Sequence, residues 1–354
     1  CKCYNCSCIC CIVTFTTLLV AFFNWGLGLI FGAIFARKVG EHASKNNIPL
    51  NYPLIGAAGY SGLMIWHGGI SGSAPIKIAE QGHFLAEKIG TISQAETIFS
   101  TMNVTISISL IILLPLFMFF LAKKTKSEIV NIIEVEKIEK IKLDGAEKID
   151  HSNLIAYIFG GIIITYCFYK AILLPDKMTL NFITPNFINL SLLGLCVILH
   201  KNFFQFIKSV DSAIKGASGI LIQFPLYFGI MGIMKDTGMI ELMSDLFISI
   251  SNENTFPIFT FFSAGLVNIF VPSGGGQWAI QGPIIVEAAM KLGVSIPKSV
   301  MSLAYGDQIT NMLQPFWALP LLGITGLKAK EILPYTLLLM LLGGVIFITG
   351  LLIF

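Results

Sequence analysis

Long apolar runs are the feature of this sequence that most restricts its fold. A membrane's hydrocarbon core takes about 20 apolar residues of helix to cross, so a run near that length predicts a membrane segment. The runs are 12–35, 53–72, 103–122, 154–174, 186–200, 216–234, 256–292, 299–326 and 332–354. Only 12% of the residues are charged, about half the fraction of a typical soluble domain. The sequence therefore predicts an all-α polytopic membrane protein. Its net charge of +3 gives no excess that would point to nucleic acid.

The charges gather in one loop, and that loop sets the expected orientation. Seven lysines and seven acidic residues lie between Lys123 and Asp150. Lysines mark cytoplasmic loops, while acids count for little, so we expect 123–153 to be a charged cytoplasmic linker. The same rule is consistent along the chain only if segments 12–40 and 256–293 return to the side they enter from. We therefore predict two re-entrant helical hairpins, each with arms of about 10 residues or more.

The run "VPSGGGQWAIQ", residues 271–281, puts three glycines inside the second hairpin. Irregular backbone at membrane depth is tolerated only where protein or a water-filled cavity satisfies its polar groups. Glycines permit a tight tip, and we expect a positive φ at Gly275 and close approach of a ligand there. Helix N-termini at such a tip suit an anion. A glycine-packed helix interface is the alternative, which explains Gly160 and Gly161 better than it explains this polar run.

The two hairpins begin two similar stretches of sequence. "FFNWGLGLIFGAIF" and then "GAAGYSGLMIWHGGISG" align with "LVNIFVPSGGGQWAI" and then "SLAYGDQITNMLQPFWALP". Asn24 matches Asn268 and Tyr60 matches Tyr305, with separations of 36 and 37 residues. Because the two hairpins are predicted to open from opposite sides of the membrane, the repeat is inverted. Inverted repeats with broken helices are typical of secondary transporters.

The predicted organisation follows from this repeat. Residues 1–11 form a leader outside the fold, and an incomplete repeat 1 covers 12–122, with hairpin 12–40, broken helix 53–74 and helix 103–122. After the linker 123–153, repeat 2 covers 154–354, with scaffold helices 154–234, hairpin 256–293, broken helix 299–326 and helix 332–354. Within it, 203–214 is expected to be an interfacial amphipathic helix.

The leader contains six of the eight cysteines. A metal site or a disulfide cluster is the alternative to a segment outside the fold. No histidine or acid lies near enough to complete a known ligand spacing.

Asp307 is the only acid in 299–326. Ionisable side chains inside a membrane are costly and usually functional, so Asp307 is expected to bind a sodium ion with Asn311 and Gln308, or a proton. A hydrated carboxylate near the mouth of the site is the alternative. His67 is its counterpart in repeat 1. Histidine titrates near neutral pH, so proton coupling, carboxylate binding and a structural hydrogen bond all remain open for it.

Other polar and aromatic residues complete the candidate site. Ser71, Ser73, Ser273 and Gln277 are candidate donors to a carboxylate, while Trp66, Trp278 and Phe316 are candidate walls for a short acyl chain. The substrate- and ion-binding candidates together are Asn24, Gly26, Gly28, His67, Gly68, Gly69, Ser71, Ser73, Asn268, Ser273, Gly274, Gly275, Gly276, Gln277, Asp307, Gln308, Asn311 and Gln314.

Four motifs resemble the short-chain fatty acid transporter family of the ion transporter superfamily. They are "FNWGLGLIFGAIFAR", "GAAGYSGLMIWHGGISGSAP", "FVPSGGGQWAIQGP" and "YGDQITNMLQPFWALPLLGI". The resemblance runs from about residue 15 to the end. It implies uptake of short-chain carboxylates such as acetoacetate or butyrate, with scaffold and transport domains and elevator-like motion. With the candidate ion site at Asp307, we expect this transport to be coupled to a cation and to cross a bacterial cytoplasmic membrane. A homodimer in lipid is the expected assembly. Repeat 1 lacks the three segments that precede the hairpin of repeat 2, so we expect an N-terminally truncated chain.

Other functions remain as alternatives. The alternative most similar to the expected function is transport of another small organic anion, such as a dicarboxylate. An ion channel would want rings of carbonyls or charges from a symmetric oligomer, which an internal inverted repeat does not favour. A membrane enzyme would want a nucleophile with its base or a metal set, and the five histidines, at 42, 67, 83, 151 and 200, show no ligand spacing. We expect no enzyme and no cofactor besides the coupling ion.

Overall fold

The computed structural model describes residues 6–129, 145, 147–174, 182 and 184–354. Their regular structure is helical, and the β pairing found among them is a single antiparallel bridge between Leu50 and Glu128. The all-α prediction is confirmed for this part of the chain. The chain divides into two compact units, residues 1–132 with 218–354, and residues 133–217.

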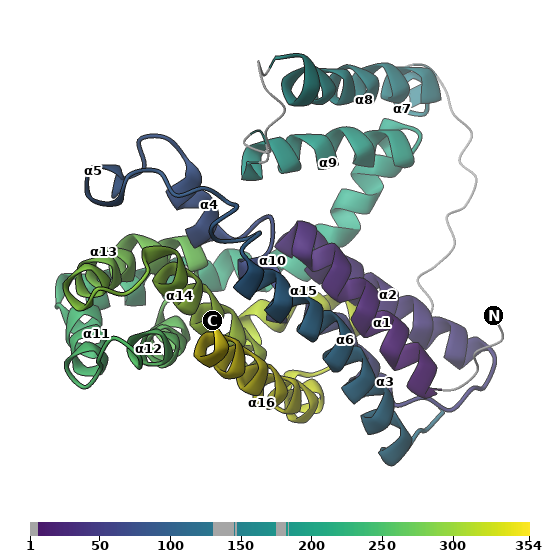
Figure 1. Ribbon diagram of the computed structural model, residues 1–354. Coiled ribbons are helices and arrows are strands. Elements are labelled where there is room, and N and C mark those ends of the chain that lie inside the picture. The colour runs from purple at the N-terminus through teal and green to yellow at the C-terminus, as the bar shows by residue number, and fades with distance from the viewer. Residues whose placement is uncertain (1–5, 130–144, 146, 175–181, 183) are drawn as a thin grey trace. The chain divides into compact units, whose positions relative to one another are not determined.

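The first unit begins with an N-terminal group of helices (Figure 1). They are α1 (Cys6–Phe23), α2 (Trp25–Lys45), α3 (Tyr52–Tyr60), the 3-10 turns η1 (Ser61–Met64) and η2 (Trp66–Gly68), α4 (Ser73–Ala79), α5 (Ala86–Ile89) and α6 (Thr101–Lys124).

A C-terminal group of helices completes the first unit. They are α11 (Met239–Ser249), α12 (Phe256–Phe270), α13 (Gly274–Leu292), α14 (Ile296–Thr310), the 3-10 turn η4 (Asn311–Leu313), α15 (Pro315–Thr325) and α16 (Ala329–Ile353). The two groups pack on each other through α15 on α2, α4 on α13, and α16 on α3 and α6.

The second unit contains α7 (Glu147–Asp150), α8 (Asn153–Phe168), a π-helical turn η3 (Tyr169–Leu173), α9 (Pro185–Leu199) and the start of α10 (Phe203–Asp236). Glycines let α8 and α9 pack closely, since a methyl group on Gly160 would lie 2.6 Å from the Ile198 side chain. Between α9 and α10 the chain bends by 116°.

Two predicted boundaries are wrong. Residues 203–214 and 216–234 form the single helix α10 instead of an interfacial and a spanning helix. Lys215 and Gly216 stand at the junction and do not end the helix, because one internal glycine costs only about 1 kcal/mol. The leader 1–11 was placed outside the fold, but residues 6–11 belong to α1 and Cys10 is buried. Most of the charged linker, residues 130–144 and 146, lies outside the described residues.

The closest helix contact in the N-terminal group joins α2 to α3. A methyl group on Gly32 would collide with the backbone carbonyl of Gly59, and one on Gly59 would collide with the carbonyl of Gly32. Contacts of this kind let two helices approach until their backbones touch. They fix α3 against α2, just before the chain turns into η1.

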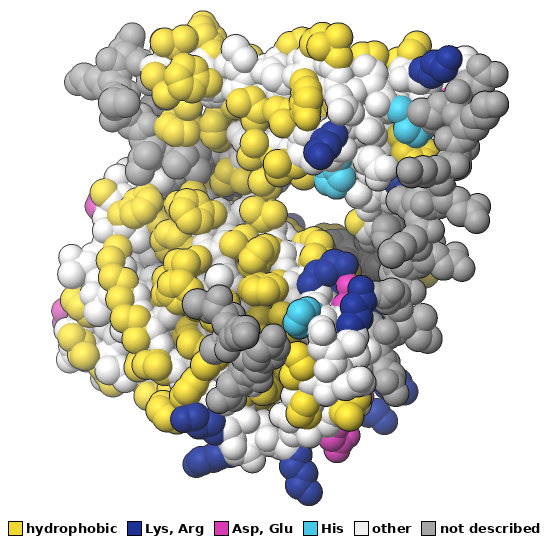
Figure 2. All heavy atoms as spheres, turned by 90° about the vertical axis from the view of Figure 1, so that its right-hand side faces the viewer, with side chains coloured by type: hydrophobic (Ala, Val, Ile, Leu, Met, Phe, Trp, Pro, Cys, Tyr) yellow, Lys and Arg dark blue, Asp and Glu magenta, His cyan; other side chains and the backbone are white. Residues whose placement is uncertain are grey.

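Several helices are long and apolar enough to cross a membrane. In the described residues these are α1, α6, α8 continued by η3, and α16, with the bent α9–α10 pair as a fifth. Exposed apolar side chains cover α1, α6 and α16, including Phe15, Ile112 and Val345. Figure 2 shows hydrophobic side chains spread over much of one face, with Lys and Arg in small clusters. Such a surface suits lipid better than water, so the chain is a multi-pass membrane protein.

Candidate functional site

The first polar feature is a break between α14 and α15, residues 311–314, which we call the second break. After α14 ends at Thr310, the 3-10 turn η4 follows and Gln314 is extended, with φ −90° and ψ 111°. A residue before proline avoids the helical region. Pro315 also has no N–H to donate to the carbonyl of Asn311, four residues earlier. The dipeptide Gln314–Pro315 therefore sets this break locally.

The first break, residues 65–72, separates η1 from α4. Gly69 is extended, with φ −95° and ψ −175°, and α4 begins at Ser73. Close contacts with the end of α1 hold it. A methyl group on Gly69 would collide with the carbonyl of Phe22, and the N–H of Ile70 donates to that carbonyl at 2.7 Å. The first break thus depends on tertiary packing.

A buried hydrogen-bonded pair of ionisable side chains joins the first break to α14, just before the second break. His67 Nδ1 lies 2.5 Å from Asp307 Oδ2, and both side chains are almost fully buried. The backbone N–H of Ala74 donates to His67 Nε2 at 3.1 Å. Since Nε2 accepts a hydrogen bond, Nδ1 carries the ring proton and donates it to the Asp307 carboxylate. The structure brings together two candidates that lie 240 residues apart.

Three amide side chains surround this pair. Gln308 Oε1 accepts the N–H of His67 at 2.8 Å. Asn268 Nδ2 lies within 2.6 to 2.9 Å of the Asp307 carbonyl, Thr310 Oγ1 and Asn311 Oδ1. Gln314 Nε2 donates to the Asn268 carbonyl at 2.6 Å. The end of α12 is therefore bonded to the second break.

The N-terminus of α13 reaches the same place. Ser273 caps α13, accepting the N–H of Gly276 at 3.2 Å. A methyl group on Gly274 would lie 2.8 Å from both Trp66 Cη2 and His67 Cε1, so only glycine lets the helix end approach these rings. Gly275 faces more open space, since a methyl group there would lie 3.9 Å from Ser73.

The expected positive φ at Gly275 is wrong. None of the glycines at 274–276 has a positive φ, because all three already belong to the first turn of α13. The reason for glycine here is the close approach at Gly274.

Gln277 points away from the breaks, which corrects its expected role as a carboxylate donor. Its Nε2 donates to the Ala264 carbonyl at 2.8 Å and to Gln281 Oε1 at 2.9 Å. Gln281 in turn donates to Ser263 and Ser244. This buried ladder of polar side chains connects α13 to α12 and α11.

The turn between α1 and α2 forms a second polar cluster. Asn24 caps α2, accepting the N–H of Leu27 at 2.8 Å, and Ser71 Oγ accepts the N–H of Trp25 at 2.9 Å. A methyl group on Gly26 would lie 3.5 Å from Asn24 Oδ1, whereas one on Gly28 would collide with Ala21 of α1. Gly28 therefore serves helix packing. Asn24 and Asn268, matched in the repeat, differ here, because Asn24 is a cap and Asn268 lies inside α12.

Some buried polar atoms have no hydrogen-bond partner. At the breaks these are Asn268 Oδ1, Gln314 Oε1 and Trp66 Nε1, and away from the breaks they include Gln277 Oε1 and Trp278 Nε1. Buried polar atoms are nearly always paired. Amide oxygens are hard ligands that suit cations, and indole N–H groups can only donate. These atoms are therefore open to ligands of either charge.

The candidate aromatic wall forms only in part. Trp66 stacks on His67 with ring centres 4.4 Å apart and lies 6.2 Å from Trp25, which lies 5.2 Å from Trp317. Phe316 contacts Trp317. Trp278 packs in another cluster, against Phe84. Sequence reasoning missed Trp25 and Trp317, although both stand next to a candidate residue or a proline.

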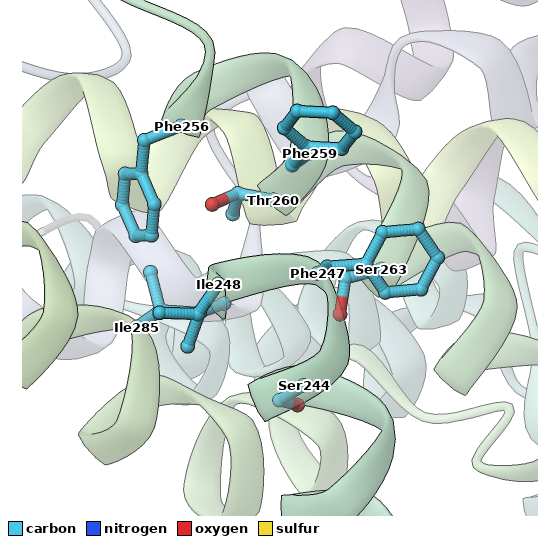
Figure 3. A pocket seen from close by; sticks show the side chains of 8 residues that line it. All are labelled: Ser244, Phe247, Ile248, Phe256, Phe259, Thr260, Ser263 and Ile285. Carbon is cyan, nitrogen blue, oxygen red and sulfur yellow. The ribbon is translucent and has the colours of Figure 1, made fainter. Parts of the chain in front are cut away.

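Two cavities lie away from the breaks. One of about 10 Å³ sits between α11, α12 and α13, and Figure 3 shows three phenylalanine rings and three hydroxyl groups around it. That volume is at the lower limit for one water molecule, so it is too small for a carboxylate substrate. A wider depression of about 600 Å³ lies at the ends of α3, α6 and α16. Its lining has mixed charge, because it includes Lys126 as well as Glu128 and Glu331.

Sequence reasoning also missed three residues that contact the breaks. Tyr60 donates to the Asn311 carbonyl at 2.8 Å, Asn103 donates to the Gly68 carbonyl at 2.8 Å, and Tyr305 donates to Asn103 at 2.9 Å. The sequence repeat matched Tyr60 with Tyr305, but it assigned no role to either side chain. Asn103 is the first residue of an apolar run, where an amide is out of place.

No group of three or more metal-ligating side chains is found among the described residues. The described cysteines of the leader, Cys6, Cys8, Cys10 and Cys11, are free thiols along α1. The cysteine metal site therefore finds no support in this part of the chain.

Apolar helices around a buried histidine–aspartate pair and unpartnered amides define a membrane protein with a polar site at two helix breaks. The chain belongs to the short chain fatty acid transporter family, whose family model matches residues 4–354. Two proteins named "Putative short-chain fatty acid transporter" are each 37% identical to it. The one from Escherichia coli K12 aligns over 97% of this chain and 78% of its own length. The one from Haemophilus influenzae aligns over 96% and 77%. No solved structure matches.

Proposed function

We propose that this protein carries short-chain monocarboxylates across the cytoplasmic membrane together with a cation. The observation that supports this most is the buried Asp307–His67 pair, which lies where the breaks of the two helix groups meet. An ionisable pair inside a membrane has a high free-energy cost, and such residues usually mark the path of a substrate or an ion. Family membership supports the substrate class, since the two relatives are named as short-chain fatty acid transporters.

The coupling ion, a proton or sodium, binds at Asp307. A carboxylate substrate brings a negative charge into a low-dielectric barrier, and a cation bound nearby lowers that cost. The unpartnered oxygens of Asn268 and Gln314 suit a hard cation. Asn311, the other expected ligand, offers an oxygen that already accepts from Asn268.

The substrate carboxylate binds at the N-terminus of α13. Helix N-termini attract anions, and Ser73 lies opposite Gly275 there. The indole N–H of Trp66 is a further donor without a partner. Trp25, Trp66 and Trp317 form the apolar wall for the acyl chain.

The two helix groups act as inverted repeats in an elevator-type transporter. Each group has a helix pair, α1–α2 or α12–α13, followed by a broken helix. Their packing is reciprocal, because the second half of each broken helix, α4 or α15, packs on the second helix of the other pair. The linker 123–153 faces the cytoplasm in this arrangement.

Uptake of labelled butyrate into proteoliposomes, under imposed proton or sodium gradients, tests this function. We expect saturable uptake that one of the two gradients drives. Better uptake of succinate would instead indicate a dicarboxylate transporter. Flux that neither saturates nor responds to a gradient would indicate a channel, and chemical change of the carboxylate would indicate an enzyme.

A cysteine introduced at Lys137, in a variant whose own cysteines are replaced, tests the orientation. It should react with an impermeant maleimide only in inside-out vesicles. Labelling of intact cells would contradict the inverted repeat.

A further inference from the structure

The two breaks leave backbone carbonyls without the N–H partner that a regular α-helix would give them. The residue four positions after Asn311 is Pro315, which has no N–H, and the Asn311 carbonyl accepts instead from the N–H of Gln314 at 3.2 Å. At the first break the N–H of Gly72, four residues after Gly68, donates to Gly69 instead. A carbonyl oxygen has two lone pairs, so a side chain can add a donor at each position.

Tyr60 serves the second break from the N-terminal group. Its hydroxyl donates to the Asn311 carbonyl at 2.8 Å and lies 3.3 Å from the Gln314 carbonyl. Tyr60 is 1% exposed, so water cannot replace this donor. The hydroxyl is a second donor to the Asn311 carbonyl, at a shorter distance than the N–H of Gln314 at 3.2 Å.

Asn103 and Tyr305 serve the first break. Asn103 Nδ2 donates to the carbonyls of Gly68 and Ile98, at 2.8 and 2.6 Å. Tyr305, from the C-terminal group, donates to Asn103 Oδ1 at 2.9 Å and so fixes which way the amide points. Gly68 directly follows His67, so this chain of bonds ends beside the His67–Asp307 pair.

We propose that Tyr60, and Tyr305 acting through Asn103, are positioning residues through which each helix group fixes the break of the other. This inference rests on the proposed function only where transport is measured. Each tyrosine belongs to one group and acts on the opposite break. The geometry of the site is therefore shared between the groups.

Tyr52 provides a matched control. It lies in α3 with Tyr60, is also buried, and donates to the Thr325 carbonyl at 2.9 Å, again across the two groups. Thr325 is at the end of α15, away from both breaks. Tyr60→Phe and Tyr52→Phe each remove one hydroxyl-to-carbonyl bond, so a purely structural role predicts equal effects on both variants.

Hydrogen exchange of the amides at 311–314, in nanodiscs without substrate, tests the inference independently of transport. A hydrogen bond contributes about 1 kcal/mol net, so Tyr60→Phe should speed exchange there about 3- to 10-fold, while Tyr52→Phe should leave it unchanged. Equal exchange at 311–314 in the two variants would overturn the inference.

Butyrate uptake gives the second readout. In Tyr60→Phe we expect KM to rise about 3- to 10-fold, with Tyr52→Phe within about twofold of the parent at equal amounts of folded protein. Tyr305→Phe should raise KM less, because Asn103 keeps both of its donated bonds. A parent that takes up no butyrate would contradict the proposed function, while the exchange experiment would still decide the inference.

Discussion

The two helix breaks have similar surroundings but different causes. The dipeptide Gln314–Pro315 disfavours a regular helix at the second break, even without tertiary packing. The first break has no proline between Ile65 and Gly72 and depends on Gly69 fitting against Phe22. The second break therefore has a local cause in addition to its tertiary hydrogen bonds, whereas the first break has no such local cause. We expect the first break to be the more sensitive to small changes in volume.

The largest effect is expected at the His67–Asp307 pair, which joins the first break to α14. Asp307→Asn keeps the shape and an acceptor for His67 but removes the charge. A hydrogen bond to a charged group is worth about 1.5–3 kcal/mol, so gradient-driven accumulation should fall about 10- to 100-fold, while exchange of preloaded substrate survives.

Uptake of labelled butyrate into proteoliposomes with and without a gradient measures both activities. Glu287→Gln is the control, because Glu287 is exposed on α13 and pairs only with Lys291. If Asp307→Asn accumulates butyrate as well as the parent does, Asp307 is not the coupling residue and His67 becomes the next candidate.

Gly69→Ala tests the first break directly. The added methyl group would collide with the Phe22 carbonyl, which is backbone and cannot turn aside. Overpacking costs about 1–3 kcal/mol, so uptake should fall about tenfold. Gly161→Ala in α8 is the control, because its methyl group meets nothing within 4 Å.

Gly274→Ala tests whether α13 sets the position of the first break. Its methyl group would press on the rings of Trp66 and His67, which are side chains and can shift, so we expect a loss of about fivefold. Gly275→Ala, whose methyl group meets no ring, is the comparison, and we expect it to lose less than Gly274→Ala. If both variants lose activity equally, contact with these rings is not what the glycines provide.

Pro315→Ala should have the smallest effect. It restores an N–H four residues after Asn311, but Tyr60 and the bond from Gln314 to Asn268 still hold the second break. We expect uptake within about threefold of the parent, since one modest hydrogen-bond change is involved. A larger loss than in Gly69→Ala would reverse the comparison between the breaks.

Local chemistry made part of this molecule predictable. Apolar runs predicted helices, and Pro315 and the polar residues around Asp307 marked the second break, because these signals act within a few residues. The contact between His67 and Asp307 depends on how helices pack across 240 residues, which no local pattern encodes. Sequence could place Gln277 beside the glycines but could not tell that its side chain points into the α12–α13 pair.

The continuity of α10 also could not be predicted from a local sequence pattern. The amphipathic pattern of 203–214 predicted a separate surface helix, yet periodicity describes a face and cannot show where a helix ends. Asn103 was overlooked because the run 103–122 was judged by its mean hydropathy, which hides a single polar residue. Its single amide is what reaches the Gly68 carbonyl.

The contact between Gly32 and Gly59 has a genetic consequence. Each glycine is opposed by the other's carbonyl, so no change of one residue makes room for a side chain at the other. In a scan of all single substitutions, both positions should be as intolerant as a catalytic residue although neither touches substrate. Revertants of a lesion at either position should restore glycine there, and second-site suppressors should be rare.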